Sequence, residues 1–177
     1  MGLFKKKTHP RIERLNQLGA KLVGKKLVDV WYHDCTQEDG TPFYQDSKSN
    51  LRHEIMQGID LTVSDGITLG FYWEWFEEYE LEIIEEGLKS LNLNKGLSIT
   101  NTSTEIQWAQ RIGKTIKMLT FTTDNWGCLI DCRIDFDGAD PVWICARQAN
   151  NDCMSNGDDT IVIFDEHEAK RVGIKVS

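Results

Sequence analysis

The segment GIDLTVSDGITLGFYW (58–73) constrains the fold of this chain most strongly, because it holds two β-rich runs joined by Asp65-Gly66. Apolar and polar residues alternate on both sides of this dipeptide, which is typical of strands with one buried face. An Asp-Gly pair favours a two-residue hairpin turn whose central residues take positive φ. We therefore predict an antiparallel hairpin whose second strand runs on to Trp75.

A second Asp-Gly pair ends a similar run further along the chain. IDLTVSDG (59–66) resembles IDCRIDFDG (130–138) with one inserted residue, and LVGKKLVDV (22–30) matches RIGKTIKML (111–119) with Gly24 and Gly113 aligned. The repeat favours two similar β-hairpin halves, 20–91 and 104–177, within one domain. Chance similarity between such short segments is the alternative explanation.

The remaining patterns indicate an α+β fold dominated by an antiparallel sheet, with about three short helices. We predict a helix after Thr8, a second over 104–111 capped by Ser103, and a third that begins at Asp165 in a capping box. Further strands are predicted at 22–34, 114–122, 127–136, 142–148 and 160–164, separated by turns at 124–125, 137–138 and 156–157. Residues 77–91 are consistent with a strand or a helix, and we favour a strand through Ile84; 92–104 is predicted to be a connector.

Length and composition indicate one globular domain, 1–177. No apolar run approaches the ~18 residues needed to cross a bilayer, and the start MGLFKKK lacks the apolar core of a secretory signal. Five cysteines without paired spacing argue against a disulfide framework. We therefore expect a cytoplasmic protein with free thiols and no membrane partner.

The charge of the chain, −8 overall, is distributed unevenly. Residues 1–26 hold eight Lys and Arg against one Glu, 70–88 hold seven Glu and no base, and 124–168 hold eleven Asp and Glu against two Arg. Acidic segments repel phosphate backbones and attract basic proteins. We therefore expect no direct contact with nucleic acid, and a basic N-terminal segment that is solvated.

The run GFYWEWFEEYELEIIEE (70–86) sets aromatic residues beside these glutamates. A core strand with a solvated acidic face explains this composition, and so does an interface for a basic partner, because aromatic anchors and complementary charge are typical of interfaces. A second acidic set lies in predicted loops at strand ends, where binding residues often occur. The predicted partner-binding residues are Tyr72, Glu74, Phe76, Glu77, Glu78, Glu80, Glu82, Asp137, Asp140, Asp152, Asp158 and Asp159.

The catalytic and metal-binding templates each fail at a particular residue. Gly113-Lys114-Thr115 is similar to the end of a P-loop, but Trp108 stands where the first glycine is needed. IDFDGAD (134–140) has Arg133 and Ile144 at positions where a calcium loop needs ligands. A zinc site or a Cys–His pair drawn from His33, Cys35, Cys128 and Cys132 lacks the tight paired spacing of strong zinc signals. We predict no catalytic residue, no metal and no cofactor.

In length, acidity, β-rich pattern and missing catalytic motifs, the chain resembles the immunity proteins of bacterial toxin–immunity systems, including those of contact-dependent growth inhibition. The local resemblance is carried by VSDGITLGFYWEW (63–75) and GDDTIVIFDEHEA (157–169). It implies a non-enzymatic inhibitor that binds a cognate toxin domain, commonly a basic nuclease, and blocks its active site or substrate path.

Two alternatives stay open from the sequence. The first is a small cytosolic enzyme, a metal-assisted hydrolase whose site is assembled from scattered residues such as Asp131, Asp135 or His33. The second is a structural or regulatory module of a larger assembly, with the acidic strand as its docking edge.

Overall fold

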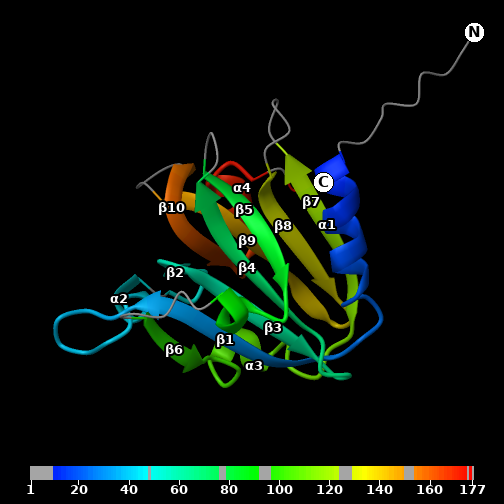
Figure 1. The fold of residues 1–177 in the computed structure, drawn as a ribbon, viewed down its shortest axis with the longest axis horizontal. Coiled ribbons are helices and arrows are strands. Elements are labelled where there is room, and N and C mark those ends of the chain that lie inside the picture. Colours follow the sequence, from blue (N-terminus) through cyan, green and yellow to red (C-terminus); the bar gives the residue numbers. More distant parts are fainter. Residues whose placement is uncertain are drawn as a thin grey trace, which may run out of the picture.

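The computed structural model describes residues 10–47, 49–75, 79–91, 97–123, 129–149, 154–174 and 176, which form two five-stranded antiparallel sheets (Figure 1). The first sheet has the order β5–β4–β3–β1–β6 and the second β2–β10–β9–β8–β7. The first comprises β1 (Leu27–Cys35), β3 (Gly58–Val63), β4 (Thr68–Trp75), β5 (Tyr79–Glu85) and β6 (Leu97–Asn101). The second comprises β2 (Arg52–Ile55), β7 (Ile116–Thr123), β8 (Leu129–Phe136), β9 (Ala139–Ala149) and β10 (Met154–Ile163).

Short helices accompany the sheets: α1 (Pro10–Ala20), α2 (Tyr44–Ser47), α3 (Ile106–Ala109), α4 (Glu166–Arg171) and the 3-10 turn η1 (Leu88–Leu91). The predicted α+β class, dominated by antiparallel strands, is confirmed, although the strands divide into two sheets rather than one. Within the described residues, no helix is both long and apolar enough to cross a membrane.

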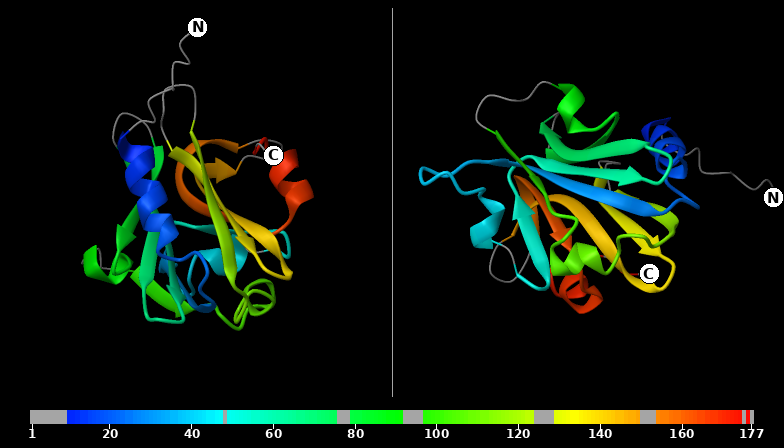
Figure 2. Two further views of the ribbon diagram at one scale, coloured as in Figure 1. Left: turned by 90° about the vertical axis from the view of Figure 1, so that its right-hand side faces the viewer. Right: turned by 90° about the horizontal axis from the view of Figure 1, so that it is seen from below.

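The main core lies between the two sheets, because alternate residues of each strand point inward. Ile59 and Leu61 of β3 and Ile144 of β9 are fully buried there. The outer face of β9 and β10 carries a second apolar cluster, in which Trp143 packs with residues of α4. Figure 2 shows α1 beside the opening between the sheets and α4 on the far side of the second sheet. This arrangement leaves the outer faces of β4–β5 and β7–β8 as candidate surfaces.

The two segments that were aligned in the sequence at Gly24 and Gly113 contact each other reciprocally. The Gly24 amide donates to Ile116 O at 2.8 Å, and the equivalent Gly113 amide donates to Leu27 O at 2.7 Å. Both glycines take positive φ, +80° and +79°. The first strand of each half then leads into a three-strand meander, β3–β4–β5 in one sheet and β8–β9–β10 in the other.

Several local predictions are corrected by the structure. The Asp65-Gly66 hairpin forms, but only Gly66 takes positive φ, and the loop between the paired Val63 and Ile67 has three residues, 64–66. This is the turn with a bulge that lets Asp65 keep an ordinary conformation. The dipeptide 156–157 lies within β10, where the register with β9 shifts, rather than in a turn.

The predicted helix caps and the predicted connector are confirmed in part. Asp165 caps α4 as predicted, because its carboxylate accepts from the Glu168 amide at 2.8 Å. Ser103 does not cap α3; its hydroxyl accepts from the Val30 amide instead. Residues 79–85 form a strand, as favoured, whereas 97–101 and 52–55, predicted as connector and unassigned chain, form the edge strands β6 and β2.

Candidate functional site

Four of the predicted partner-binding residues meet on the outer face of β4 and β5. Tyr72 pairs with Glu82 across the two strands, and Glu74 pairs with Glu80. All four side chains point away from the main core, since Phe71, Leu81 and Ile83 occupy the inward positions. The sequence run that combines aromatic and acidic residues therefore forms a real cluster on one surface.

Two carboxylates of this cluster are already neutralised within the chain. Glu80 and Glu82 are largely buried, and Arg11 of α1 binds both of them. Arg14, one turn later, donates to Glu82 Oε1 at 2.9 Å. The arginine-rich start of α1 thus compensates the acidic strand, which the sequence analysis had taken to be uncompensated.

The same arginines cover the free edge of β5, the outermost strand of its sheet. Arg11 and Arg14 approach the carbonyl oxygens of Leu81 and Ile83, each at 3.4 Å. The Ile83 amide donates to Glu82 Oε1 at 2.9 Å. Edge strands with free backbone groups promote self-association, so these contacts protect β5. An edge that is covered in this way argues against the alternative in which the acidic strand is the docking edge of a larger assembly.

Tyr72 and Glu74 remain partly exposed next to the neutralised pair. The Tyr72 hydroxyl donates to Glu74 Oε2 at 2.8 Å. Burial, followed by the hydrogen bond to Glu74, raises the pKa of Tyr72 well above its ordinary value. Tyr72 is therefore a neutral donor at physiological pH, and no ion pair to Glu74 is formed by the described residues.

The other predicted residues do not join this cluster. Asp137 lies in the turn between β8 and β9 and Asp140 near the start of β9, at the opposite end of the sandwich from the Trp75 end of β4 (Figure 1). Asp137 is exposed and 3.8 Å from Lys117, and the Asp140 carbonyl accepts from the buried Arg111. Asp158 and Asp159 lie on β10. Phe76, Glu77, Glu78 and Asp152 lie outside the described residues.

His33, considered for catalysis and zinc, has a structural partner that the sequence did not suggest. Its Nε2 atom lies 2.8 Å from Asp60 Oδ2 on the neighbouring strand β3, and both side chains are buried. Asp60 Oδ1 accepts from the Leu88 amide at 2.7 Å. This His–Asp pair thereby fastens η1 onto the outer face of the first sheet.

His33 is not brought together with Cys132 for a zinc site, nor with Asp131 and Asp135 for a hydrolase site. Cys132 points into the core between the sheets, whereas His33 lies on the outer face of the first sheet. Asp131 and Asp135 share the outer face of β8 in the second sheet. Cys128 lies outside the described residues, among which no group of three metal-ligating side chains occurs.

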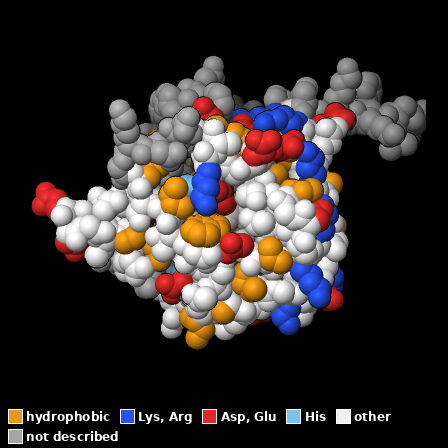
Figure 3. Space-filling view, turned by 60° about the horizontal axis from the view of Figure 1, so that its bottom comes forward, with side chains coloured by type: hydrophobic (Ala, Val, Ile, Leu, Met, Phe, Trp, Pro, Cys, Tyr) orange, Lys and Arg blue, Asp and Glu red, His pale blue; other side chains and the backbone are white. Residues whose placement is uncertain are grey.

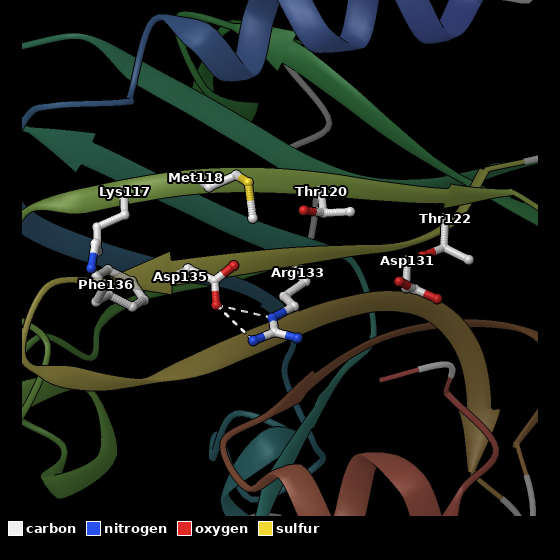
Figure 4. A pocket seen from close by; sticks show the side chains of 8 residues that line it. All are labelled: Lys117, Met118, Thr120, Thr122, Asp131, Arg133, Asp135 and Phe136. Atoms are coloured by element: carbon white, nitrogen blue, oxygen red, sulfur yellow. Dashed lines mark hydrogen bonds and ion pairs between the residues drawn. The ribbon is translucent and has the colours of Figure 1, made fainter. Parts of the chain in front are cut away.

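A groove on the outer face of β7 and β8 is a feature that the sequence analysis missed. It measures about 710 Å³ and is lined by Lys117, Met118, Thr120, Thr122, Asp131, Arg133, Asp135 and Phe136 (Figure 4). The strands place Met118 opposite Asp135, Thr120 opposite Arg133 and Thr122 opposite Asp131. Six of these residues alternate along their two strands, so a prediction of the set requires knowing that β7 and β8 are neighbours. Lys117 and Phe136 join the set where the register of the two strands shifts.

The face formed by β1, β6 and α3 carries exposed apolar side chains. They include Val28, Ile99 and Ile106, and Lys89 lies over the Trp31 ring at 4.2 Å. Figure 3 shows hydrophobic side chains on this side as separate spots among polar ones. Scattered apolar residues are ordinary on protein surfaces, so we assign no site here.

Comparison of the chain with protein-family models, with curated proteins and with solved structures finds no match. The functional argument therefore depends on the surfaces described above.

Proposed function

We propose that the protein is a non-enzymatic, immunity-type inhibitor that neutralises a cognate basic toxin domain in the cytoplasm by protein–protein binding. The observation that carries this proposal is the Tyr72–Glu74 pair on β4. The donor to Glu74 is neutral, and no described residue forms an ion pair with this carboxylate, which lies beside a partly exposed aromatic ring. Aromatic anchors are enriched among the residues that dominate interface energy, and unpaired surface charge steers association with an opposite charge.

The pairing of the neighbouring acids narrows the proposed contact. Glu80 and Glu82 interact with Arg11 and Arg14, so their charges are largely cancelled locally. Tyr72 and Glu74 are then the centre of the proposed interface, held by a regular strand and preorganised by their hydrogen bond. Preorganised side chains lose little conformational entropy on binding.

The test uses the protein encoded next to this chain, with its C-terminal domain purified as the toxin. We expect that domain to lose its activity when the chain is added at equal molar amount. The Tyr72→Ala variant should need at least about tenfold more protein for the same inhibition, as expected for loss of an interface anchor. Full inhibition by this variant would remove Tyr72 from the contact, and no inhibition by the wild type would contradict the function.

A further inference from the structure

The groove on β7 and β8 contains a buried carboxylate oxygen that accepts no hydrogen bond. Asp135 Oδ1 accepts from Nε and Nη2 of Arg133, at 3.0 and 2.8 Å. The second oxygen, Asp135 Oδ2, is buried and accepts no hydrogen bond from any residue that the structure describes. Leaving a buried acceptor unpaired is unfavourable, so the carboxylate gains free energy when an external group supplies a donor.

The carboxylate is held in place by the residues around it. Arg133 stacks over the Trp143 ring at 5.4 Å and binds Asp135 from the same strand. Asp131, which is only 1% exposed, provides a second carboxylate in the groove. An ionised donor makes a shorter and stronger hydrogen bond to a carboxylate than a neutral donor does. The two cations in the lining, Lys117 and Arg133, already contact Asp137 and Asp135. The acceptor that remains on Asp135 therefore favours a cation that carries N–H groups.

The remaining lining distinguishes between kinds of cation. Met118, the cross-strand neighbour of Asp135, is 52% exposed, and its flexible thioether can adapt to a ligand. Phe136 adds an aromatic surface, and Thr120 and Thr122 add hydroxyl acceptors. A planar guanidinium presents apolar faces and a row of N–H groups at its edge, whereas an ammonium is a compact, strongly hydrated charge.

We propose that this groove binds a guanidinium group, with the Asp135 carboxylate as its main acceptor. The groove lies on the second sheet, and Tyr72 and Glu74 lie on the first. The guanidinium site therefore does not rest on the proposed function.

The Met118 methyl group is a direct reporter of this site. The full chain labelled with ¹³C at its methionine methyls is titrated with N-acetyl-arginine amide, N-acetyl-lysine amide or potassium chloride at matched ionic strength. We expect a saturable shift of the Met118 signal with the arginine probe, a weaker response to lysine and none to the salt. The Met56 signal, outside the groove, should stay constant in all three titrations.

Two aspartate variants separate the site from general charge. Asp135→Asn should weaken binding of the arginine probe at least about tenfold, the effect of losing one charge-assisted hydrogen bond. Asp39→Asn removes the same charge from an exposed loop outside the groove and should leave binding unchanged. A Met118 shift that is reproduced by potassium chloride, or equal affinity in Asp135→Asn, overturns the site. Equal affinity for the lysine probe overturns the guanidinium assignment.

A third variant tests the site without removing its acceptor. Met118→Arg places a guanidinium on the cross-strand neighbour of Asp135 and should occupy the groove from within the chain. We expect the arginine probe no longer to shift the backbone amide of Thr120, while the Met56 signal keeps its position and shows that the fold is intact. Undiminished probe binding to this variant contradicts the proposal.

Discussion

The buried carboxylate of Asp60 leaves no room for a side chain at Gly87. Its oxygens bind His33 and the Leu88 amide, each within 2.8 Å. Gly87 takes positive φ, +75°, and a Cβ at this position would lie 2.7 Å from Asp60 Oδ2. That separation is shorter than any normal contact, so a side chain there must displace the carboxylate or η1. The glycine is needed both for its backbone conformation and for space.

Replacing Gly87 by alanine therefore combines two penalties. We expect Gly87→Ala to lower the free energy of unfolding by more than about 2 kcal/mol, from left-handed backbone strain plus the clash. Gly24→Ala is the matched control, since Gly24 has φ +80° but nothing within 4 Å of an added Cβ. It should cost only the strain, about 1 kcal/mol. Urea denaturation measures both, and equal losses would show that the space above Asp60 is not restricted.

Helix α1 stabilises the first sheet through its two arginines. Removing Arg11 leaves the buried carboxylates of Glu80 and Glu82 without their shared partner. Unpairing a buried ion pair costs about 3–5 kcal/mol, and less where one member is partly exposed, as Arg11 is. We expect Arg11→Ala to lower the free energy of unfolding by about 2–3 kcal/mol.

The more exposed Arg14 is the control for this prediction. Its side chain is 54% exposed, so Arg14→Ala should cost under about 1 kcal/mol. Light scattering should also show more self-association for Arg11→Ala, because the carbonyl edge of β5 is then less covered. A smaller loss for Arg11→Ala than for Arg14→Ala would contradict the assigned role of α1.

Helix α4 is joined to β2 through Glu168, and this contact makes stability depend on pH. The hydrogen bond from Arg171, with further help from Arg52, holds the pKa of Glu168 below its ordinary value of 4.5. The folded state therefore binds fewer protons than the unfolded state near pH 4, so stability rises with pH in this range. The contribution is complete above pH 4.5 and is lost as the pH falls through the lowered pKa of the folded state.

The Glu168→Gln variant isolates that contribution. We expect it to be about 1 kcal/mol less stable than the wild type at pH 7, a value typical of partly exposed ion pairs. The difference should shrink as the pH approaches 3, because the wild-type carboxyl group is then increasingly protonated. Urea denaturation of both proteins at pH 7 and pH 3 checks this. A difference in stability that is the same at both pH values would show that the charge of Glu168 does not contribute to this contact.

At the scale of the whole molecule, the predictable parts are those encoded locally. The hairpin around Asp65 and the cap at Asp165 both depend on residues close in sequence, and each is present. Strands β2 and β6 were missed because each is short and is defined by its pairing with β10 or β1, distant in sequence. The composition of a short strand gives little information about such long-range pairing.

Only the part of the candidate site that lies on a single strand was predicted from the sequence. The sequence placed Tyr72 and Glu74 on one face, and alternation along one strand is sufficient for that. It did not show that Arg11 neutralises Glu80, because the two residues are 69 positions apart. The groove at Asp135 depends equally on a neighbouring strand.

The central claim is tested most directly by calorimetry at two salt concentrations, which measures the affinity of the chain for its proposed toxin, the C-terminal domain of the protein encoded next to it. We predict binding that weakens with salt and falls at least about tenfold in Glu74→Gln. Glu85→Gln makes the same change of charge at the far end of β5, where Glu85 pairs with Lys21, and should bind as the wild type does. Salt-independent binding, or equal weakening by both variants, would contradict recognition of a basic partner through Tyr72 and Glu74.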